Sequence, residues 1–205
     1  MLLVPPFPPR AAAKHPPRAL EAANVDDPDR YTRLAETHDG KGKHAASCRT
    51  RRLTGMNALM LLKQDHDEVK SMLSDLESTT ERAVKTRTDG LASLKAELEV
   101  HEAIEEEIFY PALKEHPKTK DLALEGYEEH HVVDMVMAEI EDVAPSDETW
   151  MAKFTVMKEN LEHHIEEEEG EMFEQAERVF DDDELDDLGE RMQARKDELK
   201  AGSSA

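Results

Sequence analysis

Four histidines of this 205-residue chain stand where the inward stripe of an α-helix normally carries apolar side chains. They are His66, His101, His130 and His164. Two of them are followed four residues later by a glutamate, which gives the pairs His101/Glu105 and His164/Glu168. Residues four apart lie on one face of an α-helix, so each pair points in one direction. Burying such groups is costly unless each finds a partner, and a metal ion held between helices is such a partner.

Apolar spacings of three and four residues predict five helices, with order beginning near Asn57. The predicted ranges are 57–78, 84–114, 120–142, 148–179 and 183–200. Ser146 or Asp147 is predicted to cap the fourth helix, and the aspartates at 181–183 favour the start of the fifth. Short links make the first four helices antiparallel neighbours. The predicted fold class is therefore all-α, an up-down-up-down four-helix bundle with an extra C-terminal helix and a disordered N-terminal extension.

Each of the first four predicted helices carries one apolar stripe that only His or Glu interrupts. The stripes are Leu62, His66, Val69, Leu73, Leu76; Leu94, Leu98, His101, Glu105, Ile108; Ala123, Gly126, His130, Val133, Met137, Ile140; and Phe154, Met157, Leu161, His164, Glu168, Met172. A single histidine on such a face is usually a satisfied core residue, and acidic runs are usually solvated. Six polar groups meeting in one core, with no inward Lys or Arg, instead predict a metal site.

The chemical types of the predicted ligands restrict which metals can bind. Imidazole and carboxylate without thiolate suit iron, manganese or zinc. The chain has a single cysteine, Cys48, so no cysteine-rich metal site is available. Six ligands exceed the tetrahedral demand of one zinc ion, whereas a carboxylate can bridge two ions. We therefore expect two ions, bridged by Glu105 and Glu168 and capped by histidines on either side, with iron, manganese and zinc as the candidates.

The chain resembles the hemerythrin-like HHE cation-binding family through four segments at about residues 56–180. They are MNALMLLKQDHDEV, HEAIEEEIFYPAL, LEGYEEHHVVDMVMAEI and HHIEEEEGEMF. The resemblance implies a four-helix bundle with a di-iron centre that meets oxygen or peroxide. Oxygen-carrying members have a fifth histidine one turn after the ligand at His130, but this chain has Asp134 there. Reversible oxygen carriage is therefore not expected. Glu102, directly after His101, would be an additional ligand, as in some members of the family.

Two ligand choices involve neighbouring histidines. His164, and not His163, lies on the stripe of its helix. The register favours His130 over His131, although His131 also lies on a plausible apolar face. The alternative role for His131 is to orient a ligating side chain without binding the metal itself. Two tyrosines near these motifs are interpreted as core or rim residues, with the metal pocket as the alternative: Tyr110 and Tyr127.

Charge and proline content divide the chain. Residues 1–55 hold seven of the 10 prolines and have a net charge of +4, so they are predicted to be a disordered extension. The family resemblance begins abruptly at Met56, where the native protein is expected to start. Residues 56–180 form the predicted bundle, and residues 181–205 the predicted C-terminal helix and tail.

Residues 56–205 carry a net charge of −26, which disfavours nucleic acids and anionic membranes as partners. No apolar run is long enough to span a bilayer, so a cytoplasmic location is expected. The predicted function is a di-iron protein that senses or consumes a small ligand such as oxygen, peroxide or nitric oxide. The alternatives are a non-catalytic iron-binding or storage protein and a purely structural acidic bundle. Catalytic residues and any protein partner stay unknown.

Overall fold

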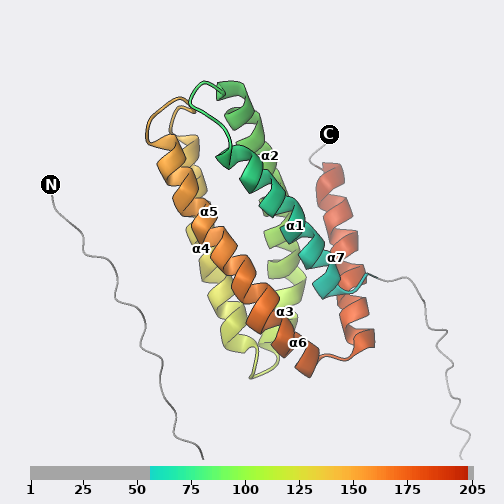
Figure 1. Cartoon of the computed structure of the whole chain (residues 1–205). Helices are drawn as coiled ribbons and strands as arrows, with labels where there is room; N and C mark the ends of the chain where they lie inside the picture. Colours follow the sequence, from blue (N-terminus) through green and yellow to red (C-terminus); the bar gives the residue numbers. More distant parts are fainter. Residues whose placement is uncertain (1–55, 203–205) are drawn as a thin grey trace, which may run out of the picture. The chain divides into compact units, whose positions relative to one another are not determined.

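The computed structural model describes residues 56–202, and every regular element in that range is helical (Figure 1). The elements are α1 (Ala58–Glu77), α2 (Val84–Ile104), η1 (Glu105–Phe109), α3 (Tyr110–Lys114), α4 (Lys120–Glu141), α5 (Trp150–Glu167), η2 (Glu168–Met172), α6 (Phe173–Val179) and α7 (Asp182–Gly202). The predicted extension at 1–55 and start at Met56 concern residues that lie outside this range or at its edge. The predicted all-α class is confirmed.

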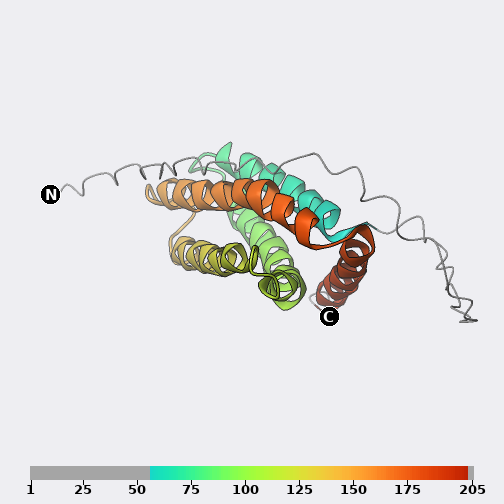
Figure 2. The same ribbon diagram turned by 90° about the horizontal axis from the view of Figure 1, so that it is seen from below.

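Four long helical rods form the bundle, and two of them are composite. The rods are α1, the continuous run α2–η1–α3, α4, and the continuous run α5–η2–α6. Figure 2 shows them packed side by side, with α7 on one flank next to α1. Asn57 caps α1, because its Oδ1 accepts a hydrogen bond of 2.9 Å from the Met60 amide. The up-down-up-down order expected from the short links is confirmed.

Both composite rods contain a π-helical segment that the sequence pattern did not predict. η1 begins at Glu105 and η2 begins at Glu168, four residues after His101 and His164. A π-turn inserts one residue into an α-helix and is frequent at functional sites. The inserted residue shifts the face that follows it. The prediction that Ile108 continues the buried stripe is therefore wrong, since Phe109 and Tyr110 are fully buried there and Ile108 only partly.

Helix α7 packs against α1, α2 and η1. A reciprocal cap starts it, in which the Glu184 amide donates to Asp181 Oδ1 and the Asp181 amide donates to Glu184 Oε2, each at 2.9 Å. Gly189 is buried against the chain that enters α1. A Cβ atom at this position would lie 2.3 Å from the Met56 carbonyl oxygen, which is backbone and cannot rotate away. The absence of a side chain here lets α7 lie directly on α1.

Replacing Gly189 by alanine is therefore expected to loosen α7. The overlap with the backbone of Met56 cannot be relieved by a rotamer change, and overpacking of this kind costs about 1–3 kcal/mol. Chemical denaturation should show that loss of stability. Gly170→Ala is the matched control, because a Cβ atom there meets nothing within 4 Å. Equal stability of the two variants would contradict the close docking of α7.

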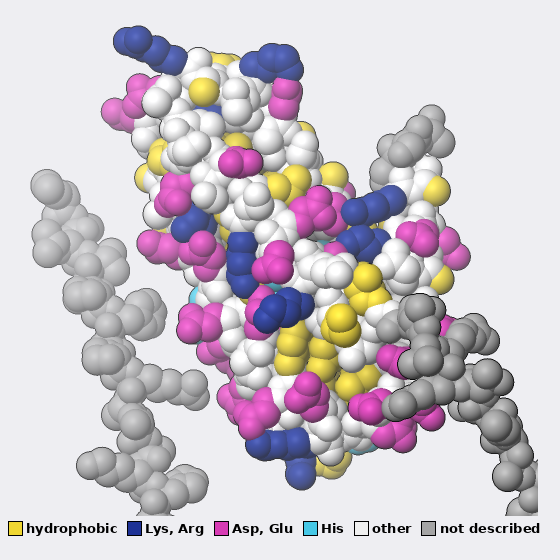
Figure 3. Space-filling model, turned by 45° about the vertical axis from the view of Figure 1, so that its right-hand side comes forward, with side chains coloured by type: hydrophobic (Ala, Val, Ile, Leu, Met, Phe, Trp, Pro, Cys, Tyr) yellow, Lys and Arg dark blue, Asp and Glu magenta, His cyan; other side chains and the backbone are white. Residues whose placement is uncertain are grey.

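Between residues 56 and 202, no helix is both long and apolar enough to cross a membrane. Acidic side chains are scattered over the whole face in Figure 3, with fewer basic ones among them and a hydrophobic patch in its lower half. The charge imbalance seen in the sequence is thus spread over this surface.

Candidate metal centre

The six side chains predicted as metal ligands lie together inside the bundle. Each is 0–3% exposed. They form two groups of potential ligand atoms, each spanning no more than 4.8 Å: the first consists of His66, His101, Glu105 and Glu168, and the second of Glu105, His130 and His164. Glu105 belongs to both groups. The structure therefore brings all the sequence-predicted site residues to one place, with Glu105 between its two halves.

The imidazoles turn their Nε2 atoms toward the two inner carboxylates. Glu105 Oε2 lies 3.3 Å from His130 Nε2 and 3.4 Å from His101 Nε2. Glu168 Oε2 lies 3.0 Å from His66 Nε2 and 3.9 Å from His164 Nε2. All four Glu105 and Glu168 oxygens lack a hydrogen-bond partner, as do Nε2 of His66 and of His101. Buried polar atoms are rarely left unsatisfied, so this cluster fits a bound cation.

Two of the imidazoles face each other directly. His130 Nε2 lies 3.2 Å from His164 Nε2, in a buried position. Each ring uses its Nδ1 on a carboxylate, which makes Nδ1 the protonated nitrogen and leaves a lone pair on Nε2. Two lone pairs at this distance repel each other unless a proton or a metal ion lies near both. This contact is the second observation that fits a metal in the centre.

Each of the four histidines has a further carboxylate near its Nδ1 atom. The pairs are His66 with Glu169 at 3.2 Å, His130 with Glu106 at 3.0 Å, His164 with Glu129 at 2.8 Å, and His101 with Asp65 at 3.7 Å. The first three distances allow a hydrogen bond and the fourth is slightly too long. Such outer carboxylates orient a ligating imidazole and raise its basicity. Sequence reasoning missed them because each acid belongs to a run of charges typical of a solvated surface.

Glu106 lies beside the centre although it is not one of the predicted ligands. The sequence stripe placed Glu106 outside the site, whereas its Oε1 accepts the hydrogen bond from His130 Nδ1. Glu106→Gln is therefore expected to weaken metal binding about 10-fold or more, as losses of outer partners do. Competition with a chelator would measure this effect. Glu166→Gln is the control, since Glu166 is exposed, and equal retention by both variants would contradict a role for Glu106.

Burial and mutual repulsion set the protonation of the inner carboxylates. Burial raises the pKa of Glu105 well above its ordinary value, and the negative charge of Glu168 raises it further. Burial and the neighbouring His164 together lower the pKa of His130 to about 3. Two carboxylates this close cannot both ionise without a compensating charge. In the metal-free protein the pair therefore holds a proton, which a metal ion would replace.

Tyr110 adds a hydroxyl to the centre. It is fully buried, and its OH lies 3.3 Å from His130 Nε2. Gly126 makes the room, because a Cβ atom at that position would come within 2.8 Å of the same hydroxyl. Tyr110 thus belongs to the buried core, as interpreted from the sequence, and its hydroxyl also lies beside the candidate metal centre. Tyr127 lies at the rim, where its OH donates to the backbone oxygen of Glu106 at 3.1 Å.

The other residues considered as ligands from the sequence lie outside the two buried groups of ligand atoms. His131 and His163 are exposed, as the choice of His130 and His164 requires. Glu102 belongs to neither buried ligand group. Burial, together with the nearby acids Asp134 and Glu106, raises its pKa to about 8. Glu102 is thus held neutral beside the centre.

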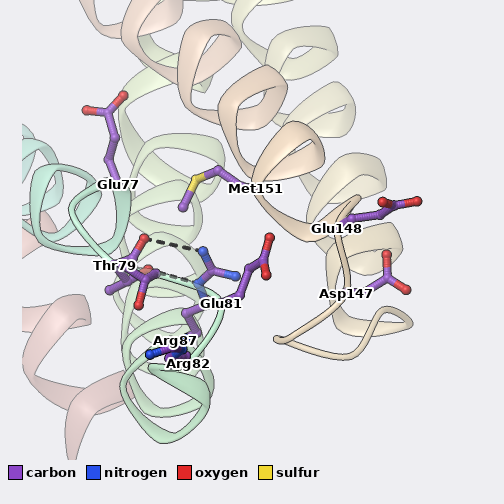
Figure 4. Close-up of a pocket in the computed structure, with 9 residues that line it drawn as sticks. Glu77, Thr79, Glu81, Arg82, Arg87, Asp147, Glu148 and Met151 are labelled. Atoms are coloured by element: carbon purple, nitrogen blue, oxygen red, sulfur yellow. Dashed lines mark hydrogen bonds between the residues drawn. The ribbon is translucent and has the colours of Figure 1, made fainter.

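A surface pocket of about 530 Å³ lies at the far end of the bundle, where α1 ends and α2 and α5 begin (Figure 4). Arg87 lines it but is internally satisfied. Its guanidinium donates to Thr79 and to the Pro145 carbonyl oxygen and lies 4.5 Å from the Trp150 ring centre. These contacts explain Arg87 as a structural residue, and none of the residues that line the pocket belongs to the two buried groups of ligand atoms.

Comparison with known proteins gives a consistent result. The hemerythrin HHE cation binding domain matches residues 57–176, more than half of the chain. Among solved structures, the fold is similar to the crystal structure of a hemerythrin HHE cation binding domain-containing protein from Mycobacterium kansasii, with a TM-score of 0.64 and 27% identity. That match covers 71% of this chain and 88% of the other. No curated protein matches the chain.

Proposed function

This chain belongs to the hemerythrin HHE cation binding domain family, and on that premise we propose that its buried centre holds two non-haem iron ions and reacts with a small oxidant. The observation that carries the proposal is the set of unpaired Glu105 and Glu168 oxygens among four imidazoles. Oxygen, peroxide and nitric oxide are the ligands we propose. A cytoplasmic location also remains a prediction.

The proposed ligand set divides into two halves. His66 and His101 would hold one ion, and His130 and His164 the other. Glu105 belongs to both groups of ligand atoms, and Glu168 approaches a histidine of each half, which favours two ions over one. Histidine with carboxylate suits iron and also accommodates manganese or zinc.

The protein's own groups would prepare the centre for a small ligand. Iron bound there would supply the electrons for reducing oxygen or peroxide. Tyr110 places a hydroxyl 3.3 Å from His130 Nε2, where it can donate a hydrogen bond to a ligand entering that half. The outer carboxylates Glu106 and Glu129 keep the protons of His130 and His164 on Nδ1. The burial of all six predicted ligands excludes bulk water from the same space.

Metal analysis and optical spectroscopy test this proposal. The full chain is produced in iron-rich medium, and its iron, manganese and zinc are quantified. We expect about two iron ions per chain, as the shared carboxylates require. Stopped-flow absorption spectra of the iron-loaded protein should then change after addition of peroxide, oxygen or nitric oxide. A protein that retains one zinc ion and takes up no iron would overturn the di-iron proposal.

Iron binding without turnover is the second candidate function. Complete burial of the six side chains favours it, because an enclosed centre exchanges metal and ligand slowly. The same experiment separates the two functions. Stoichiometric iron whose spectra do not change with oxygen, peroxide or nitric oxide would identify a binding or storage protein. Repeated consumption of peroxide would instead identify a reactive centre.

A further inference from the structure

Helix α7 sends one charged side chain into the bundle. Lys196 is buried, and its Nζ donates a hydrogen bond to Asp65 Oδ1 on α1. The same Nζ lies 3.4 Å from Glu97 Oε1 on α2. A buried ammonium is costly unless it is paired, so these contacts hold it in one place. α7 itself lies beyond the residues matched by the family, which end at 176.

Asp65 links Lys196 to the candidate metal centre, because it lies between Lys196 and His101. Its second oxygen, Oδ2, has no hydrogen-bond partner and faces His101 Nδ1, which also has none, at 3.7 Å. Asp65 is thus the outer carboxylate that faces Nδ1 of His101. Glu106 and Glu129 have the same position relative to His130 and His164. Those two glutamates have no lysine or arginine partner among residues 56–202, whereas Asp65 shares its charge with Lys196. The outer partner of His101 therefore differs from those of His130 and His164. It resembles Glu169, the outer partner of His66, which pairs with the partly exposed Lys63 and Lys70 on the surface, whereas Lys196 is buried.

We propose that Lys196 is a positioning residue of the metal centre, which acts through Asp65 to set how strongly His101 donates to its metal. The inference rests on the proposed iron centre. An ammonium on Oδ1 withdraws charge from the Asp65 carboxylate and keeps Oδ2 turned toward His101. Without the ammonium, Asp65 would attract the His101 Nδ1 proton more strongly and make the imidazole a better donor. A stronger donor stabilises the more highly charged, oxidised metal.

The proposal predicts opposite shifts for two neighbouring substitutions. Lys196→Met removes the positive charge, so the reduction potential of the iron-loaded protein should fall. Asp65→Asn removes the negative charge while an amide oxygen can still accept from His101, so the potential should rise. Asp65→Asn should also release iron to a chelator about 10-fold faster or more. A purely structural role would weaken iron retention in both variants without opposite shifts in potential.

A charge-neutral double variant covers the case in which Lys196→Met fails to fold with an unpaired buried Asp65. In Asp65→Asn/Lys196→Met no buried carboxylate is left without its cation. Because the effect of Lys196 passes through Asp65, adding Lys196→Met to the Asp65→Asn protein should leave the potential unchanged. Lys196→Arg, which keeps the charge, should behave like the wild type.

Arg195→Gln is the matched control on the same helix. Arg195 binds Glu107 through two contacts of 2.7 and 3.0 Å and touches none of the six predicted ligands. It tests whether any weakening of α7 alters the centre. The experiment uses the full chain loaded with iron, with the potential measured by spectroelectrochemistry and retention by chelator competition.

The outcomes are distinct. Opposite shifts for Lys196→Met and Asp65→Asn, with none for Arg195→Gln, would support the proposal. Shifts of the same sign, a shift in Arg195→Gln of equal size, or an effect of Lys196→Met that persists in the Asp65→Asn protein would overturn it. Failure of the wild-type chain to bind iron would instead overturn the proposed function, so the two failures can be told apart.

Discussion

Glutamine at position 105 is expected to remove iron from both halves of the centre. Glu105 is the residue shared by the two groups of ligand atoms, and an amide neither carries the charge nor bridges two cations as a carboxylate does. Metal analysis should therefore show Glu105→Gln with less than half of the wild-type iron. Loss confined to one half, with the other ion retained in full, would contradict the shared position of Glu105.

The same substitution should increase the stability of the metal-free protein. Both Glu105 carboxylate oxygens are buried without a hydrogen-bond partner, and burial raises the pKa of this group well above its usual range. At neutral pH this carboxyl must therefore take up a proton on folding, a cost that a neutral amide does not carry. Metal-free Glu105→Gln should thus unfold at a higher denaturant concentration than the metal-free wild type. Glu166→Gln, an exposed change of the same charge, should alter neither the iron content nor the stability.

Removing the metal from the wild-type chain is expected to lower its thermal stability by about 10 °C. A ligand that binds only the folded state, at 100 to 1,000 times its dissociation constant, stabilises that state by about 3–4 kcal/mol, and a chain of this size shifts by about 2–4 °C per kcal/mol. Differential scanning calorimetry of iron-loaded and chelator-treated protein measures the difference. The far-ultraviolet spectrum should remain helical, because two apolar clusters of the bundle do not depend on metal.

A ligand variant provides the control for this measurement. His66→Ala removes one imidazole from the first ligand group, so chelator treatment should shift its unfolding temperature much less than that of the wild type. The Ser93→Ala variant offers a surface control, because Ser93 is exposed and bonds only within its own helix. If chelator treatment leaves the wild-type transition unmoved, metal binding is not coupled to folding in this protein.

Much of the bundle could be predicted from the sequence because helical periodicity is a local property. The spacing of apolar residues predicted five helices, and four stripes brought six polar residues inward, among them His66 and Glu168. A helical face is determined by residues three and four apart, so the inward position of a histidine follows from its neighbours in the chain. The choice of His164 over His163 followed from that register.

Features that depend on several helices at once could not be predicted in this way. The π-turn that begins at Glu105 buries Phe109 and Tyr110 in place of Ile108, and nothing in the local spacing indicates where an inserted residue is tolerated. The outer carboxylates were hidden in acidic runs that resemble any solvated surface. All four face histidines on other helices, three of them at hydrogen-bond distance.

Lys196 shows most clearly what only the tertiary structure decided. In the sequence it is one basic residue in a charged C-terminal helix, 131 residues from Asp65. Its burial depends on α7 lying directly on the start of α1, where Gly189 has no side chain to hold them apart. The sequence by itself determined which residues face the interior of each helix. The packing of the helices determined which carboxylate meets which histidine, because those distances depend on the positions of whole helices relative to one another.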